Sequence, residues 1–103
     1  MEQALIRIKR AVLAGRVRFS LKAREEMTRD GLDVQDIVEA IMTAWSIQKV
    51  LRSTSPFRRL HHEMLYIIVS PTLSGLLVYT KGKFENEAGE EVYYFLVSSK
   101  RAL

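Results

Sequence analysis

A run of apolar residues at helical spacing, followed by strand-like runs, constrains the fold of this chain more than any other feature. The helical series comprises Val34, Ile37, Val38, Ile41, Met42 and Trp45. Residues at these intervals share one face of an α-helix, and such a face normally packs on a core. Asp33 is positioned to cap the helix. We therefore expect Ile37, Ile41 and Trp45 to be buried against a sheet.

Two further helices are predicted before this one. The first carries an apolar face made of Leu5, Ile8, Ala11 and Val12. Gly15 is a suitable residue to end it, because glycine tolerates the left-handed conformation that often closes a helix. The second helix covers residues 21–29. Ser20 is its expected N-cap and Gly31 its expected end.

The rest of the chain has the composition of β-strands. The strand-like runs are SIQKVLRS, MLYIIVS, LLVYTKGKF and VYYFLVSSK, separated by turn residues and by the acidic segment ENEAGEE. Helices followed by strands with short connections are typical of an α+β domain. We therefore predict a single domain over residues 1–103, with N-terminal helices packed on a small antiparallel sheet of three to five strands.

The composition excludes several classes of site. The 103 residues contain no cysteine and two histidines, so a disulfide framework, a thiolate nucleophile and a classical zinc cage are not expected. No apolar run approaches the length that spans a bilayer. The sequence thus predicts a cytoplasmic protein that needs no metal or other cofactor and does not enter membranes.

The basic residues are concentrated in blocks. Residues 1–24 hold seven basic residues and one acidic residue, and residues 47–83 hold six and one, whereas residues 25–46 hold one basic residue and six acidic residues. Basic blocks indicate an anionic partner, most commonly nucleic acid, although a solvated basic surface is the alternative. The acidic helix that begins at Val34 disfavours DNA reading by a helix-turn-helix.

Alternation along the last two strand-like runs predicts which side chains share a face. In the first run these are Leu77, Tyr79 and Lys81. In the second they are Tyr94, Leu96, Ser98 and Lys100. If the two strands pair as a hairpin, these two sets of side chains come together on one side of the sheet.

Such a cluster suits phosphate, because ammonium groups neutralise its charge and hydroxyl groups donate hydrogen bonds. It would contain Tyr79, Lys81, Ser98 and Lys100, with Arg52 able to join from the first strand, and it would contain no carboxylate. The alternative is that lysines at strand ends, including Lys83, only discourage aggregation.

Two adjacent histidines, His61 and His62, lie between a pair of arginines and the strand that starts near Met64. Histidine titrates near neutral pH and is the usual proton shuttle. On a strand the two rings would point to opposite faces, so only one of them would enter a site. The alternative is an exposed pair in a basic loop.

The order of the segments AGRVRFS, DGLDVQDIVEAI, SGLLVYTKGK and VSSK resembles the MqsR-type ribonuclease toxins of bacterial toxin–antitoxin pairs. It is also similar to an uncharacterised-domain family grouped with the RelE and YoeB toxins. The likeness covers nearly the whole chain. It implies a small sheet with packed helices and cleavage of single-stranded mRNA without metal. It also implies a cognate antitoxin as partner and allows a homodimer.

The resemblance extends to individual residues. The family's tyrosine on the strand after the glycine turn matches Tyr79, its C-terminal lysine matches Lys100, and its mid-chain lysine falls near Lys49 or Arg52. Lys81 and Lys100 would then stabilise the phosphorane, Tyr79 would donate a proton or stack on a base, and His62 or Tyr79 would act as acid or base. The implied substrate-binding residues are Lys49, Arg52, Arg58, Arg59, Lys83 and Ser98. The rival hypothesis is a non-catalytic relative that binds RNA or a protein.

Overall fold

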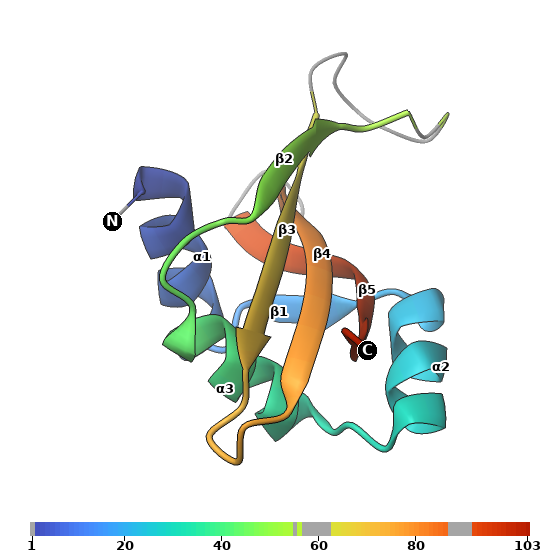
Figure 1. Ribbon diagram of the computed structural model, residues 1–103. Coiled ribbons are helices and arrows are strands. Elements are labelled where there is room, and N and C mark those ends of the chain that lie inside the picture. The colour runs from blue at the N-terminus through green and yellow to red at the C-terminus, as the bar shows by residue number, and fades with distance from the viewer. Residues whose placement is uncertain (1, 55, 57–62, 87–91) are drawn as a thin grey trace.

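The computed structural model describes residues 2–54, 56, 63–86 and 92–103, and within them it contains three helices and a five-stranded sheet (Figure 1). The elements are α1 (Gln3–Leu13), β1 (Val17–Phe19), α2 (Leu21–Asp30), α3 (Val34–Thr43), β2 (Lys49–Arg52), β3 (Met64–Pro71), β4 (Leu77–Asn86) and β5 (Val92–Arg101). The predicted α+β class is confirmed.

The sheet is mixed, with the strand order β1-β5-β4-β3-β2. Strands β2 to β5 form the expected antiparallel meander, but β1 pairs with β5 in parallel. The prediction of a purely antiparallel sheet is therefore wrong at this edge. β1 is only three residues long. A segment that short shows too little alternation for a sequence pattern to identify it.

The helix ends follow the sequence signals. The Ser20 hydroxyl accepts a hydrogen bond from the Ala23 amide at 3.0 Å, which caps α2. Asp33 and Asp36 form a capping box at the start of α3. Gly31 closes α2 in the left-handed conformation, with φ of 71°. These predictions are confirmed.

The core lies between the sheet and the pair of helices α1 and α3. Its largest fully buried side chains include Leu5, Ile8, Ile37, Ile41, Ile68, Val78, Tyr94 and Leu96. They come from α1, α3, β3, β4 and β5, so the two helices and the three long strands share one apolar cluster. No helix in the described part of the chain is both long and apolar enough to cross a membrane.

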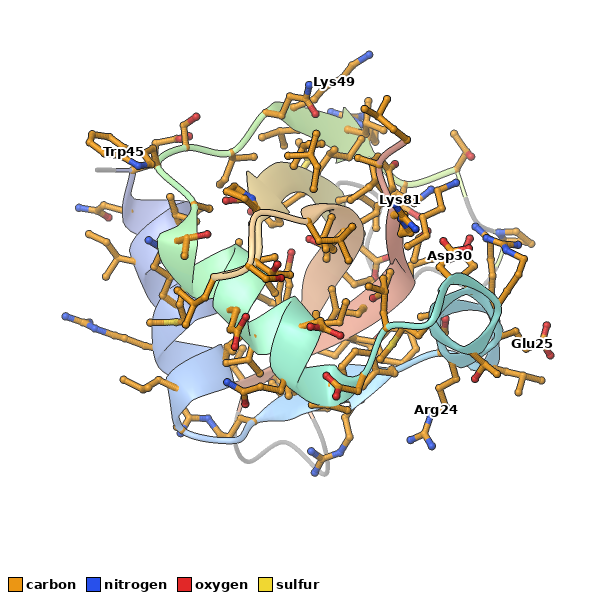
Figure 2. The ribbon with its side chains drawn as sticks, turned by 60° about the horizontal axis from the view of Figure 1, so that its bottom comes forward. Arg24, Glu25, Asp30, Trp45, Lys49 and Lys81 are labelled. Carbon is orange, nitrogen blue, oxygen red and sulfur yellow. The ribbon has the colours of Figure 1, made fainter. Side chains whose placement is uncertain are left out.

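The predicted burial of Trp45 is wrong. Helix α3 ends at Thr43, and Ala44 adopts an extended conformation, so the helical spacing does not continue to Trp45. The Lys9 ammonium group donates to the carbonyl oxygens of Met42 (3.1 Å) and Ala44 (2.6 Å), which satisfies the end of the helix. The Trp45 side chain is 91% exposed, and Figure 2 shows it projecting from the edge of the molecule.

Helix α2 lies beside β5 where β1 has ended (Figure 1). Its polar side chains bind the backbone of this strand edge. The Ser20 hydroxyl donates to the Val97 carbonyl at 2.9 Å, and Asp30 accepts from the Arg101 amide at 2.9 Å. Glu26 accepts from the Ser99 amide at 3.0 Å. The helix thus takes the place of a neighbouring strand along the second half of β5, because exposed strand edges need partners.

Candidate functional site

The sheet has a second face, opposite α1 and α3. On β4, the side chains of Val78 and Thr80 are buried on the core side. Successive side chains of a strand point to opposite faces, so Tyr79, Lys81 and Lys83 point away from the core. We call this side the outer face. Its charged and aromatic residues include Arg18, Lys49, Tyr79, Lys81, Lys83, Glu85, Tyr93, Phe95 and Lys100.

Three of the predicted catalytic residues meet on the outer face. Tyr79 lies directly opposite Lys100 in the register of β4 and β5, and the Lys100 ammonium group is 5.3 Å from the centre of the Tyr79 ring. Lys81 is the next outward residue on β4 and lies opposite Ser98. Opposed residues of antiparallel strands have adjacent side chains. The structure therefore places the Lys100 ammonium group beside the Tyr79 ring, with Lys81 on the same face of β4 two residues further along.

A β-bulge in β5 makes this arrangement possible. Lys81 is opposite Ser98 but Gly82 is opposite Leu96, which leaves Val97 without an opposite residue. One extra residue reverses the faces of the residues that follow. Tyr94 and Leu96 are therefore buried in the core, while Lys100 points outward. The prediction that Tyr94 and Leu96 share a face with Ser98 and Lys100 is wrong for this reason.

Gly82, next to the bulge, is required by close packing. A Cβ atom at Gly82 would lie 2.5 Å from Cζ of Tyr94, closer than any real contact. The Tyr94 ring therefore packs directly against the backbone of β4 at Gly82. Only glycine leaves enough room for this contact, because it has no Cβ atom.

A buried carboxylate, Glu26 of α2, lies beside the cluster. Its Oε1 accepts hydrogen bonds from the Ser98 hydroxyl at 2.7 Å and from the Ser99 amide at 3.0 Å. The expectation of a cluster without a carboxylate is wrong. Glu26 was missed because it occupies the buried stripe of α2 with Ala23 and Met27. An acidic residue on such a stripe is itself a signal that it has a buried partner.

Electrostatics fix the ionisation of these groups. Burial alone would raise the pKa of Glu26, but the hydrogen bonds from Ser98 and Ser99 and the charges of Lys22 and Lys100 hold its pKa below the ordinary value. Burial and, to a smaller extent, the charge of Glu26 raise the pKa of Tyr79. The phenol of Tyr79 therefore keeps its proton at neutral pH.

Two predicted substrate-binding groups already have protein partners. The Lys83 ammonium group lies 3.1 Å from Glu63 and 3.0 Å from Glu85. Burial lowers the pKa of Lys83, and its hydrogen bonds and charge interactions with these two carboxylates more than offset that effect, so the pKa is raised. Ser98 lies on the outer face, but its side chain is covered and its hydroxyl donates to Glu26.

Two of the remaining predicted residues, Lys49 and Arg52, lie apart from the cluster. Lys49 of β2 is opposite Ile67 of β3, which is in turn opposite Lys81 of β4. Lys49 and Lys81 are therefore separated by two strand spacings, which is roughly 10 Å. Figure 2 shows Lys49 and Lys81 above α3 in that view. Arg52 is opposite Met64 and lies three residues after Lys49 on β2. Because side chains alternate along a strand, Arg52 and Lys49 point to opposite faces, and Arg52 does not point to the outer face. The predicted residues Arg58, Arg59, His61 and His62 lie outside the described residues.

The outer face also contains a basic and aromatic group that the sequence did not predict. Arg18 of β1 lies opposite Phe95 in the parallel register, and its guanidinium carbon is 5.4 Å from the centre of the Tyr93 ring. Arg18 was missed because β1 was missed. Aromatic rings beside cationic groups are typical of surfaces that bind single-stranded nucleic acid.

A hollow of about 610 Å³ borders Lys100 at the α2 side of the outer face. It is lined by Arg29, Asp30, Lys100, Arg101, Ala102 and Leu103. Pockets that hold ligands typically have volumes of roughly 300–1,000 Å³. The surface around Lys100 therefore continues into an open hollow that contains basic side chains and the carboxylate of Asp30.

Among the described residues, no three His, Cys, Asp or Glu side chains gather in a way that would hold a metal ion. No known family model, no curated protein and no solved structure matches the chain. The function is therefore argued from the chemistry of the outer face.

Proposed function

We propose that the outer face binds single-stranded RNA and that Tyr79, Lys81 and Lys100 cleave it without a metal ion, in the manner of the ribonuclease toxins that the chain resembles. The observation that carries this proposal is the pairing of Tyr79 with Lys100 across β4 and β5, with Lys81 on the same face of the sheet. Groups of this kind stabilise the charge that develops on a phosphate during transfer.

In the proposed reaction, the ribose 2′-hydroxyl attacks the adjacent phosphorus atom and the bond from phosphorus to the 5′-oxygen breaks. The products are a 2′,3′-cyclic phosphate and a 5′-hydroxyl end. Lys81 and Lys100 stabilise the negative charge of the phosphorane. Tyr79, whose raised pKa keeps it protonated, donates a proton to the departing 5′-oxygen. His62 is the proposed acceptor of the proton from the 2′-hydroxyl.

The surroundings of the cluster support binding of an RNA strand. Lys49 extends the row of cations across the sheet, and Phe95 and Tyr79 provide ring faces on which bases can stack. A toxin of this kind would act in the cytoplasm, and a cognate antitoxin or a second copy of the chain would be its protein partner.

The second candidate is a non-catalytic RNA-binding protein with the same surface. It is favoured because two of the predicted substrate-binding side chains already have protein partners. Lys83 forms ion pairs with two carboxylates, and the Ser98 hydroxyl donates to Glu26. Both candidates predict binding of RNA, and only the first predicts turnover.

Cleavage of an unstructured RNA by the purified protein tests the proposal, with the products scored for cyclic phosphate ends. We expect cleavage that EDTA does not affect. Lys100→Ala should reduce the rate roughly 100- to 1,000-fold. Its unfolding free energy should stay within about 0.5 kcal/mol of wild type, because a partly exposed lysine contributes little to folding.

Arg24→Ala is the matched control, since it removes one charge from an exposed residue that points away from the molecule (Figure 2). It should leave the rate nearly unchanged. Tyr79→Phe keeps the ring and deletes the hydroxyl, so it separates proton donation from stacking. RNA binding without any cleavage, and without growth arrest when the protein is induced in cells, would reject the enzyme and leave the binding protein.

A further inference from the structure

Lys100 lies in a part of β5 that has a neighbouring strand on one edge only. β4 pairs with β5 as far as Arg101, with Tyr79 opposite Lys100. On the other edge β1 ends at Phe19, opposite Leu96, and no described strand accompanies the residues after it. A strand end that is hydrogen-bonded along one edge opens more easily than one that is bonded along both. The position of Lys100 therefore depends on what holds this second edge.

The second edge is held by two carboxylates of α2. Asp30 accepts a hydrogen bond from the Arg101 amide at 2.9 Å, and Glu26 accepts one from the Ser99 amide at 3.0 Å. The two acidic residues are four apart, which is roughly 6 Å along a helix, and the two amides are two residues apart, which is roughly 7 Å along a strand. These similar spacings let one face of α2 bind alternate amides of β5. The two bound amides are those directly before and after Lys100.

Asp30 lies where the helix alone would not favour an acidic residue. It is the last residue of α2, and the dipole of a helix makes a negative charge unfavourable at that end. Its ion pair with Arg29 contributes little to folding, because the Arg29 side chain is 64% exposed. The hydrogen bond from the Arg101 amide is the largest cause that lowers the pKa of Asp30, so the carboxylate is ionised at neutral pH. The contact with β5 is thus the interaction that accounts for Asp30 at this position.

We propose that Asp30, acting together with Glu26, is a positioning residue for Lys100. Hydrogen bonds to the amides on both sides of Lys100 fix the direction in which its side chain leaves the strand. The Lys100 ammonium group then stays beside the Tyr79 ring, 5.3 Å from its centre. The consequence for cleavage rests on the proposed function, in which Lys100 stabilises the phosphorane. A displaced ammonium group would stabilise that charge less.

The NMR signals of the Lys100 Cε methylene group test the position of this side chain without any RNA. The ring current of Tyr79 shifts these signals, and Tyr79→Leu, which has no ring, gives their value when the contact is absent. Asp30→Ala removes the acceptor and should lose most of that shift. Asp30→Asn keeps an oxygen acceptor and should retain most of it.

Glu25→Ala is the matched control for Asp30→Ala. It removes the same charge from the same helix, but from a side chain that points away from the molecule (Figure 2). It should leave the Lys100 signals unchanged. All variants are measured well below their unfolding temperatures, so that a loss of stability alone does not alter the signals.

The same variants test the consequence for cleavage of RNA. Removing a carboxylate beside a cationic surface would by charge alone strengthen the binding of RNA. Positioning predicts the opposite effect on the rate. Asp30→Ala should lower the rate of cleavage about 10- to 100-fold, because small displacements of a group at the reacting centre have effects of that size. Asp30→Asn should restore most of the rate, and Glu25→Ala should not lower it.

Two results would overturn the assignment. Unchanged Lys100 signals in Asp30→Ala would show that Asp30 does not position this side chain. Equal loss of the shift in Asp30→Ala and Asp30→Asn would show that the charge of Asp30 matters and its hydrogen bond with β5 does not. If wild type does not cleave RNA, the proposed function is wrong, and the Lys100 signals still decide whether Asp30 positions Lys100.

Discussion

Glu26 shows how one residue connects the helices to the candidate site. Its carboxylate joins α2 to β5 through Ser98 and Ser99, and its charge adds to the effect of burial in raising the pKa of Tyr79. A buried carboxylate is tolerated only when its hydrogen bonds are satisfied. Glu26 therefore stabilises the half of β5 that carries Lys100, and it adjusts the chemistry of the cluster as well.

The lowered pKa of Glu26 predicts how stability depends on pH. A carboxyl group whose pKa is lower in the folded state stabilises the fold above its unfolded pKa, near the ordinary value of 4.5, and loses that contribution as pH falls through the folded pKa. Wild type should therefore exceed Glu26→Gln in unfolding free energy at pH 7, and the difference should shrink below pH 4.5. Urea denaturation at a series of pH values measures this.

Glu26→Ala is the companion variant, because it removes the acceptor altogether. It leaves the Ser98 hydroxyl and the Ser99 amide without their partner and should cost about 1–3 kcal/mol at neutral pH. A difference between wild type and Glu26→Gln that stays constant from pH 7 to pH 3 would show that the charge of Glu26 has no part in folding.

At the scale of elements, α3 contributes buried residues to the core and β5 contributes residues to the candidate site. The apolar series of α3 is buried at Ile37 and Ile41, but the helix ends before Trp45. The bulge in β5 has a comparable effect, because it sends Leu96 inward and Lys100 outward from positions of the same parity. Both features are local breaks in a regular pattern.

These breaks predict that truncating two residues of the same apolar series lowers the free energy of unfolding by different amounts. Ile41→Ala should cost about 2–5 kcal/mol, because it opens a cavity at a fully buried position. Trp45→Ala should stay within about 0.5 kcal/mol of wild type, since that ring is almost fully exposed. Chemical denaturation of the two variants measures both values. A loss for Trp45→Ala as large as that for Ile41→Ala would mean that the series packs as one face.

The sequence predicted the parts of the fold that follow regular patterns. Four features could be predicted because each depends on neighbouring residues or on simple alternation. They are the helix caps at Ser20 and Asp33, the end of α2 at Gly31 and the pairing of β4 with β5. The parallel β1, the bulge at Val97 and the contact of Glu26 with Ser98 were not. Each of these is decided by long-range packing that no local window contains.

At the scale of the whole molecule, the sheet separates two cationic surfaces. The helix side has Arg7, Arg10 and Arg16, which line a pocket beside α1, and the outer face has the lysines of β2, β4 and β5. The acidic helix α3 covers the core side, where Glu39 accepts a hydrogen bond from the Leu73 amide. The basic blocks of the sequence therefore become surfaces with different chemistry, and only the outer face combines cations with a run of exposed sheet.

The central claim is that RNA binds on the outer face, and amide chemical shifts measured during titration with an unstructured RNA test it most directly. We predict shifts concentrated at Lys49, Tyr79, Lys81, Phe95 and Lys100, with an affinity that falls steeply as salt is raised. Shifts confined to α3, or binding that ignores salt, would contradict the account.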